Sequence, residues 1–535
     1  MARRDIGKLA AASVSCALMS IRILPLILFA LSACAFTSAE PVQLPTATTV
    51  RVVPATLVPT VNRQAHVIPS IQPDNTETPT PVTDCAGDDT LAPVHYAAVV
   101  NLNYTQRALV ARQTVRYVNR TADALPELVL NVEANQWPGA FTAEAVQVAG
   151  DAAVYEITGR RMSVELPEAL ETGCAQELEI SFQLNVPQIG EGISAFKGFL
   201  GHTPRQLNLS NWLLTVAPYL NGDWVIRDAS LIGEQTVAEV ADWDVTLNIS
   251  GAGESLQIAA PGEVRQTGAR NWHIAVQHSR DFAVSLSDAF AVASAETESG
   301  VTVEVYTYPD AQVVGENGNT LDGAAYALEV AVESLKMFED LFGAYPHSRL
   351  VVVEGDFPDG MEFSGIVFVS RDWFTRWPGN PASYLMLITV HEVAHQWWYA
   401  GVGSDQALAP WLDEALATYS EYVFIEEYYP ELKDWWWAFR VDNYSPEGFV
   451  DSAVYEFSSI REYINAVYLL GARMLHELRG DLGTDAFFAL LRAYAEAGHG
   501  QIVSPDLLWS LMTQEQLQAT QATRQKYLRQ PGLSG

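Results

Sequence analysis

The stretch that decides the fold is His391-Glu392-Val393-Ala394-His395, which is followed after a short gap by Trp411-Leu412-Asp413-Glu414. Side chains at positions i and i+4 lie on one face of a helix, so the two imidazoles can bind the same metal ion. A catalytic zinc uses three protein ligands and keeps its fourth position for water. Eighteen residues separate His395 from Glu414, which is the natural third ligand. The sequence therefore predicts one zinc ion per chain, held by His391, His395 and Glu414.

Glu392 lies inside the motif but is not a ligand, so it is placed to take a proton from the zinc-bound water. The alternative is an ordinary amphipathic helix that carries two histidines. The apolar run Tyr384 to Val390 leads directly into the motif and indicates the buried helix that a zinc site in the core requires. Trp398 and Gly401 stand where a metzincin needs Gly and a third His. The third ligand must then come from a separate helix, which Trp411 to Phe424 supplies.

The rest of the chain predicts an α+β protein of several domains. Residues 92–290 contain short alternating or β-branched runs with Gly, Asn and Pro between them, which favours an antiparallel β sandwich or saddle. Beyond about residue 300 we expect strands and helices together, and beyond about 445 helices alone. The expected strands are 302–308, 348–354 and 366–370, and the expected helices include 321–342, 464–479, 484–497 and 505–512.

Three blocks of sequence resemble the zinc aminopeptidases of the aminopeptidase N and leukotriene hydrolase family. The zinc helix continues as His395-Gln-Trp-Trp and is followed by Trp411-Leu-Asp-Glu414-Ala, where the family has HExxHQW(F/W) and W-L-N-E-G. Gly360-Met361-Glu362-Phe363 is similar to the family's G-x-M-E-N block, and Tyr468 to Ala472 is similar to Tyr-x-Lys-Gly-Ala. The resemblance implies an N-terminal β domain followed by a thermolysin-like α/β zinc domain that ends in helices.

The resemblance also implies roles for individual residues. Glu362, in the block with Gly360 and Met361, is expected to bind the free α-amino group of a peptide through a charge-assisted hydrogen bond. Tyr468 is expected to donate a hydrogen bond to the oxyanion of the tetrahedral intermediate. Tyr463 is the nearest competitor for that second role.

The chain departs from the family pattern at four positions, none of which is a zinc ligand or the base. Phe363 replaces Asn, which puts the detail of the amine pocket in question. Leu470 replaces Lys two residues after Tyr468, and Asp413 and Ala415 flank Glu414 in place of Asn and Gly.

The N-terminus predicts export. Basic residues precede the apolar run Ile23 to Leu31, as in a secretory signal, and Leu31-Ser32-Ala33-Cys34 resembles a bacterial lipobox. This resemblance implies cleavage before Cys34, lipidation of that cysteine, and an exported, membrane-anchored lipoprotein. The alternatives are an uncut signal anchor or cleavage nearby, for example at Ala39, and Met19 is an alternative start.

The predicted boundaries are a lipoprotein signal peptide at 1–33, a Pro/Thr-rich tether at 34–88, the β domain at 89–295 and the catalytic domain at 296–535. Two cysteines remain beyond the signal and lipidation site, Cys85 and Cys174, and an exported chain permits a disulfide between them. The net charge of −33 speaks against nucleic acid as a partner.

The function predicted from the sequence is a zinc metallopeptidase, specifically an aminopeptidase acting on peptides with a free N-terminus. Two alternatives stay open. One is a zinc endopeptidase, and the other is a non-catalytic binding or assembly protein at the membrane surface.

Overall fold

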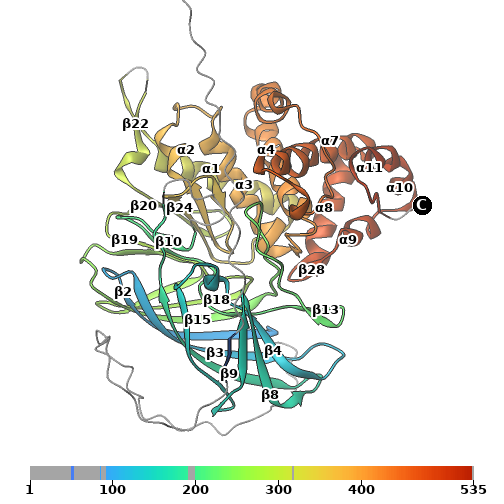
Figure 1. The fold of residues 1–535 in the computed structure, drawn as a ribbon. Coiled ribbons are helices and arrows are strands. Elements are labelled where there is room, and N and C mark those ends of the chain that lie inside the picture. Colours follow the sequence, from blue (N-terminus) through green and yellow to red (C-terminus); the bar gives the residue numbers. More distant parts are fainter. Residues whose placement is uncertain (1–49, 53–84, 86–91, 191–198, 316–317, 533–535) are drawn as a thin grey trace, which may run out of the picture. The chain divides into compact units, whose positions relative to one another are not determined.

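The structure, a computed structural model, describes residues 50–52, 85, 92–190, 199–315 and 318–532 (Figure 1). All of them belong to the unit Ala47–Gly535. The predicted signal peptide and Cys34 lie outside the described residues. No helix among the described residues is both long enough and apolar enough to cross a membrane.

The β domain is built on an eight-stranded sheet in the order β17-β18-β15-β2-β3-β9-β5-β6. Side chains alternate between buried and half-buried along β3, as expected for a strand with one face on a core. Every neighbouring pair is antiparallel except β2 and β15, which are parallel. The strands are β2 (Val94–Asn103), β3 (Ala108–Val118), β5 (Phe141–Val148), β6 (Asp151–Ala152), β9 (Ala175–Asn185), β15 (Ala241–Ser250), β17 (Glu263–Gly268) and β18 (Asn271–Ser279).

Two smaller sheets share the apolar core of this domain, in the orders β1-β7-β8-β4-β12 and β10-β11-β19-β16. Leu128, Phe182 and Leu286, one from each of the three sheets, are all fully buried in that core. The strands are β1 (Val50–Val52), β4 (Leu125–Asn131), β7 (Tyr155–Thr158), β8 (Arg161–Leu170), β10 (Gly201–His202), β11 (Leu207–Leu209), β12 (Thr215–Val216), β16 (Gln257–Ala259) and β19 (Val284–Ser287). A separate hairpin is formed by β13 (Tyr219–Leu220) and β14 (Asp223–Trp224).

The predicted catalytic domain, called the catalytic domain below, has a mixed five-stranded sheet in the order β20-β21-β24-β26-β25. Its central strands β21, β24 and β26 are parallel, whereas β20 and β25 run antiparallel to their neighbours. The strands are β20 (Ala291–Glu296), β21 (Thr302–Thr307), β24 (Arg349–Gly355), β25 (Gly360–Met361) and β26 (Ile366–Ser370). Short two-stranded sheets join β22 (Gln312–Val314) to β23 (Thr320–Asp322) and β27 (Gly403–Ser404) to β28 (Ile502–Val503).

Helices pack on one face of this sheet and then continue to the end of the described chain (Figure 1). The opposite face, with Val351, Val353 and Phe368, belongs to the apolar core of the β domain. Helix α1 (Gly323–Phe342) starts at Asp322, whose side chain accepts hydrogen bonds from the next free backbone N–H groups, and it packs on α3 and β21. The other helices are α2 (Arg371–Thr375), α3 (Tyr384–Ala394), α4 (Trp411–Tyr428), α5 (Lys433–Trp436), α6 (Ile460–Tyr463), α7 (Leu470–Leu482), α8 (Thr484–Gly498), α9 (Pro505–Ser510), α10 (Gln514–Ala519) and α11 (Gln521–Tyr527). The predicted α+β fold class is confirmed.

Two predicted boundaries need correction. The predicted division at 295/296 falls at the end of β20, yet β20 pairs with β21, so the catalytic sheet begins before that point. Within the predicted tether, Val50–Val52 forms β1 and pairs with β7 of the β domain. Strand pairing supplies backbone hydrogen bonds that composition alone does not reveal.

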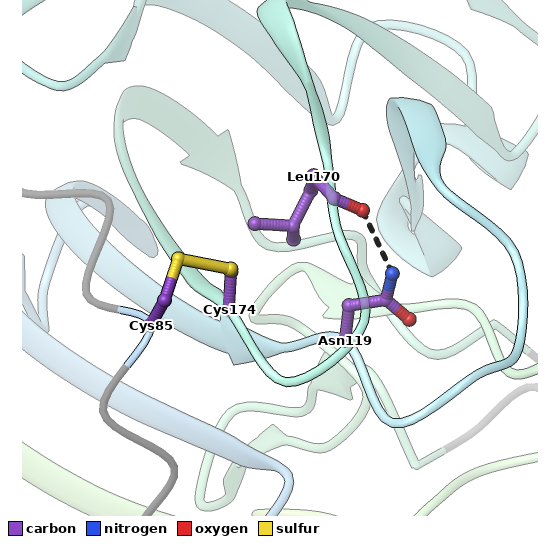
Figure 2. Close-up of a disulfide and its surroundings, with 4 residues drawn as sticks. All are labelled: Cys85, Asn119, Leu170 and Cys174. Carbon is purple, nitrogen blue, oxygen red and sulfur yellow. Dashed lines mark hydrogen bonds between the residues drawn. A yellow bond between two sulfur atoms is a disulfide. The ribbon is translucent and has the colours of Figure 1, made fainter.

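Figure 2 shows the disulfide between Cys85 and Cys174 that the sequence predicts. Cys174 is buried in the turn that connects β8 to β9. Asn119 holds this turn, because its Nδ2 donates to the carbonyl of Leu170 at 2.8 Å and its backbone N–H donates to the carbonyl of Cys174 at 2.9 Å. The bond therefore attaches the segment before β2 to a fixed corner of the β domain.

Candidate metal centre and substrate cleft

Two packed helices bring the three predicted zinc ligands together. Helix α3 is buried from Leu385 to Ala394 and presents His391, with His395 at its C-terminal end. Helix α4 starts after Pro410 and presents Glu414 in its first turn. The Nε2 atoms of His391 and His395 lie 3.1 and 3.5 Å from the same oxygen of Glu414. Ligands bound to tetrahedral zinc at 2.0–2.1 Å are separated by about 3.4 Å, so this donor set fits zinc.

Each histidine is oriented through its other ring nitrogen. The Nδ1 of His391 lies 3.1 Å from Glu421, and the Nδ1 of His395 lies 2.5 Å from Asp413. Glu421 is itself fixed by Arg440, whose Nε and Nη2 donate to its two oxygens at 2.9 Å each. Such carboxylate–histidine pairs fix the tautomer and raise the basicity of a metal ligand. Sequence reasoning missed Glu421, although it lies two helical turns after Glu414 on the same face of α4.

The environment of Glu392 suits the general-base role that the sequence predicts for it. It is buried, and its Oε2 has no hydrogen-bond partner among the described residues. Burial raises the pKa of Glu392 to about 7, and the nearby imidazoles act in the opposite direction. A base whose pKa lies near neutral is effective at neutral pH. Gly360 lies against this side chain, because a Cβ added at residue 360 would stand 2.0 Å from Glu392 Oε1.

Two further carboxylates lie beside the zinc triad, the name used below for His391, His395 and Glu414. Ligand oxygens of Glu362 and Glu234 lie within 4.8 Å of each other and of Glu414. Glu362 is buried and accepts a hydrogen bond of 3.1 Å from Gln406, whose amide also donates to Asp413 at 2.6 Å. Glu234 comes from an irregular segment between β14 and β15, and sequence reasoning missed it because no motif surrounds it.

The ionised forms of Glu234 and Glu362 are unfavourable while no cation lies beside them. Enclosure away from water, and then the charges of Glu362 and Glu414, raise the pKa of Glu234 well above its usual range. Burial likewise raises the pKa of Glu362, with Asp413 and Glu414 acting in the same direction. Among the described residues neither Glu234 nor Glu362 forms an ion pair with Lys or Arg. This end of the cleft therefore favours a cation supplied from outside.

The loop that carries Glu362 is held from both domains. The amide of Gln396 donates to the carbonyl of Phe363 at 3.2 Å, and Asp281 of the β domain accepts from the backbone N–H of Ser364 at 3.0 Å. The ring of Phe363 is buried against Phe199 and Phe368, in the core. The replacement of Asn by Phe therefore fills the core and adds no aromatic wall to the cleft.

Tyr468 lines the cleft, whereas Tyr463 does not. The ring of Tyr468 lies 5.8 Å from that of His391 and nearly parallel to it, and Tyr468 lines the cleft. Tyr463 is fully buried and does not line the cleft. Tyr468 belongs to a π-helical segment, Ile464–Leu469, of a kind often found at functional sites. Leu470, another departure from the family pattern, is also buried away from the cleft.

The cleft encloses about 500 Å³ and brings together most of the predicted site residues. Gly360, Glu362, Glu392 and Tyr468 all line it, with the three zinc ligands. Met361 is the exception among the predicted substrate-binding residues. Its side chain is buried in the apolar core, because alternate residues of β25 face opposite ways and Gly360 faces the cleft.

Comparison with known proteins agrees with this geometry. Residues 326–527 match the family model described as "Peptidase family M1 domain". Endoplasmic reticulum aminopeptidase 1 of Mus musculus is 29% identical over 258 residues, which cover 45% of this chain and 27% of that protein. Aminopeptidase M1-A of Oryza sativa subsp. japonica is 26% identical over 258 residues, 45% of this chain and 28% of that protein. The chain thus aligns with little more than a quarter of the length of these relatives.

Solved structures match over more of the chain. The M1 zinc metallopeptidase of Deinococcus radiodurans has a TM-score of 0.59 at 18% identity, covering 82% of this chain and 94% of that one. A mutant of the same enzyme bound to a Tyr-Ser-Ala substrate has a TM-score of 0.57 at 18% identity, covering 81% and 94%. At this identity the match shows a shared fold, that of a β-rich domain followed by a catalytic domain. The family resemblance and the two-domain fold predicted from the sequence are confirmed.

Proposed function

We propose that this chain, whose residues 326–527 form a peptidase family M1 domain, is a zinc-dependent aminopeptidase that removes N-terminal residues from peptides. The observation that carries this proposal is the pair of carboxylates beside the zinc triad, Glu234 and Glu362. The named relatives are aminopeptidases, which supports the same activity for this chain.

The carboxylate pair explains why the substrate needs a free N-terminus. A peptide ammonium placed between Glu234 and Glu362 would relieve the like-charge repulsion that raises the pKa of both groups. Charge-assisted hydrogen bonds to an ammonium are among the strong ones in proteins. An acetylated N-terminus has no positive charge, and it would leave the buried Glu362 and the half-buried Glu234 without a cation.

The remaining residues supply the chemistry of peptide hydrolysis. His391, His395 and Glu414 would hold the ion, and zinc in such a site polarises a carbonyl and lowers the pKa of water. Glu392, with its pKa near 7, takes the proton from the attacking water and passes it to the leaving amine. The hydroxyl of Tyr468 donates a hydrogen bond to the oxyanion as it forms.

The test compares free and N-acetylated amino-acid anilides with wild type, Glu362→Gln, Glu234→Gln and the exposed control Glu515→Gln. We expect cleavage of free substrates only. We expect kcat/KM about 10- to 100-fold lower in each of the two cleft variants, because hydrogen bonds to charged groups contribute about 1.5–3 kcal/mol. The control should match wild type. Cleavage of acetylated substrates at similar rates would indicate an endopeptidase, and no cleavage by zinc-loaded protein would favour a binding role.

We further propose that the protein is exported and anchored through a lipid on Cys34, as the lipobox-like sequence implies. The Cys85–Cys174 disulfide supports an oxidising compartment, where such bonds persist. Mass spectrometry of the mature N-terminus tests this. A lipid-modified Cys34 is expected, and an unmodified N-terminus elsewhere would contradict the anchor.

A further inference from the structure

The cleft runs along helix α3, and this gives it a direction. Glu362 is linked through Gln406 and Asp413 to His395, at the C-terminal end of the helix. Tyr384 lies at the other end, eleven residues earlier, which is about 16 Å along the axis at 1.5 Å per residue. With the substrate amine at Glu362 and the scissile bond at the zinc triad, the rest of the peptide extends toward Tyr384.

The far end of the cleft is aromatic and carries the cation of Arg461. The ring of Tyr384 stacks on Trp373 at 4.5 Å, and its hydroxyl lies 3.4 Å from that of Tyr444. The guanidinium of Arg461 lies 4.3 Å above the ring of Tyr444. All four residues line the cleft. In the described part of the chain, Arg461 forms no ion pair or hydrogen bond, although acidic residues outnumber basic ones 64 to 31 in the whole sequence.

We infer that Arg461 forms a carboxylate-binding subsite that recognises the C-terminal carboxylate of short peptides. The inference rests on the proposed function and names its substrate class. A guanidinium pairs with a carboxylate in a planar, two-pronged geometry, and stacking on Tyr444 holds the Arg461 plane ready for it. The subsite would make the enzyme prefer peptides whose two ends both lie within the cleft.

The other charged groups near Arg461 in the described residues form no hydrogen bond or ion pair with its guanidinium. Asp359 lines the cleft and interacts electrostatically with both Arg461 and Arg440, without a hydrogen bond to either. Arg440 is engaged by Glu421. Two acidic groups at this end already have partners. Asp372 pairs with Arg376 at 3.1 Å, and Glu462 accepts hydrogen bonds from Ser458.

The dimensions favour peptides of three or four residues. An extended chain spans at most about 3.3–3.6 Å per residue, so three to four residues cover about 10–14 Å. This is close to the 16 Å axial length estimated above for α3. A dipeptide would fall short of the subsite, and a hexapeptide would carry its carboxylate beyond it.

The test uses the ratio of kcat/KM for a free-acid peptide to that for its C-terminal amide. Leu-Gly, Leu-Gly-Gly, Leu-Gly-Gly-Gly and a six-residue analogue are each measured in both forms, together with Leu-Asp-Gly amide. The proteins are zinc-loaded wild type, Arg461→Gln, Arg461→Lys and Arg473→Gln. Arg473 is the matched control, because it pairs with Asp442 and does not line the cleft. Because each ratio is taken on one preparation, general losses of activity or folding cancel.

We expect wild type to prefer the free acid about tenfold at three or four residues, which corresponds to about 1.4 kcal/mol. The ratio should fall to about one in Arg461→Gln, be intermediate in Arg461→Lys, and stay at ten in Arg473→Gln. A wild-type ratio of one, or an unchanged ratio in Arg461→Gln, would overturn the inference. The only carboxylate of Leu-Asp-Gly amide is its aspartate side chain. If this peptide has the same kcat/KM as the free acid Leu-Gly-Gly, the assignment to the C-terminal carboxylate is wrong. Loss of all hydrolysis in wild type would instead refute the proposed function.

Discussion

At the scale of single residues, carboxylates in one cleft are distinguished by their partners. Glu414 is buried, which alone would raise its pKa, but hydrogen bonds from both histidines lower the pKa well below its usual range. It is therefore ionised, as a metal ligand must be. Glu392 lacks such donors and has a pKa of about 7. Glu234 and Glu362 lie close together and have raised pKa values, so a cation between them would stabilise their ionised forms.

Asp413 should tune the affinity of the metal site. Its Oδ1 lies 2.5 Å from Nδ1 of His395. Asp413→Asn keeps an oxygen acceptor but removes the charge that makes the imidazole more basic, so we expect zinc affinity to fall about tenfold. Competition with a chelating dye measures this. The exposed residue Asp434 offers a control, Asp434→Asn, that should bind zinc as wild type does. Unchanged affinity in Asp413→Asn would show that His395 needs no such support.

The sequence predicted which side chains lie together where the chemistry of a metal site imposes a spacing. The i, i+4 rule selected His391 and His395, the following helix supplied Glu414, and the structure brings the three together. Glu234 could not be found, because it lies in an irregular segment and reaches the site only through the packing of one domain on the other. Met361 was assigned to the cleft from its block alone, and the side-chain alternation of β25 turns it into the core.

At the scale of elements, the metal site depends on the close approach of α4 and α7. Gly471 of α7 lies directly against Ala415, the neighbour of Glu414 on α4. A Cβ added at Gly471 would stand 2.4 Å from the Cβ of Ala415, which neither methyl group can avoid by rotation. The absence of a side chain at residue 471 therefore sets the position of the helix that carries the third ligand.

Gly471→Ala should push α4 and α7 apart. We expect a loss of about 1–3 kcal/mol in the free energy of unfolding, together with weaker zinc binding. The double variant Gly471→Ala/Ala415→Gly removes the opposing methyl group and should recover most of the loss, apart from about 1 kcal/mol for glycine within α4. Urea unfolding and zinc titration of the four members of this cycle provide the measurement. Additive effects in the double variant would show that the two positions are not in contact.

Most elements were predictable, because long periodic segments such as 321–342 and strong strands such as 366–370 have clear patterns. The π-helical segment Ile464–Leu469 was predicted as ordinary helix, since one inserted residue barely changes an apolar pattern. Yet this segment carries Tyr468. The short edge strand β25 was not among the predicted strands, because two residues show no periodicity.

At the scale of the whole molecule, the two domains are joined through buried polar groups. Arg280 of the β domain is almost fully buried and donates hydrogen bonds to backbone carbonyls of the catalytic domain, including those of Tyr399 at 2.7 Å and Gln501 at 2.7 Å. Asp281 accepts a hydrogen bond of 2.6 Å from Tyr399 and also holds the loop after Glu362. The β domain therefore helps to position the loop that carries Glu362, the residue proposed to bind the substrate amine.

The interface between the two domains should make the free energy of unfolding depend on pH. His347 lines a cavity between the domains with His278 and His499. Burial, and then these two histidines, lower the pKa of His347 to about 4. In the unfolded chain this histidine has a pKa near 6.5. Between pH 6.5 and 4 the unfolded chain therefore binds a proton at residue 347 that the folded protein does not bind. Stability contributed by neutral His347 is therefore present above pH 6.5 and is lost as pH falls toward 4.

Removing His347 should reduce this loss. Urea unfolding of His347→Gln is expected to show a smaller decrease in unfolding free energy between pH 7 and pH 5, by roughly 1–2 kcal/mol. His95→Gln, at an exposed position of the β domain, is the matched control and should keep the wild-type dependence. If wild type and His347→Gln decline in parallel, the histidine does not contribute to acid sensitivity.

The domain order and fold class could be predicted because β-rich and helix-rich segments follow each other along the chain. The contacts at the interface between the two domains could not be predicted from the sequence. Arg280 and Asp281 stand next to each other in sequence, yet the residues that they contact outside the β domain lie more than eighty positions away, and no local pattern encodes such contacts.

The central claim is that His391, His395 and Glu414 hold one zinc ion that Glu392 uses for hydrolysis. It is tested most directly by measuring bound zinc and anilide turnover on the same preparations of wild type and Glu392→Gln. We predict one zinc per chain in both proteins and turnover lower by about 100-fold or more in the variant, because general base catalysis contributes 10²–10⁴-fold. Near-normal turnover in zinc-loaded Glu392→Gln, or a wild-type protein that is active without bound metal, would contradict the claim.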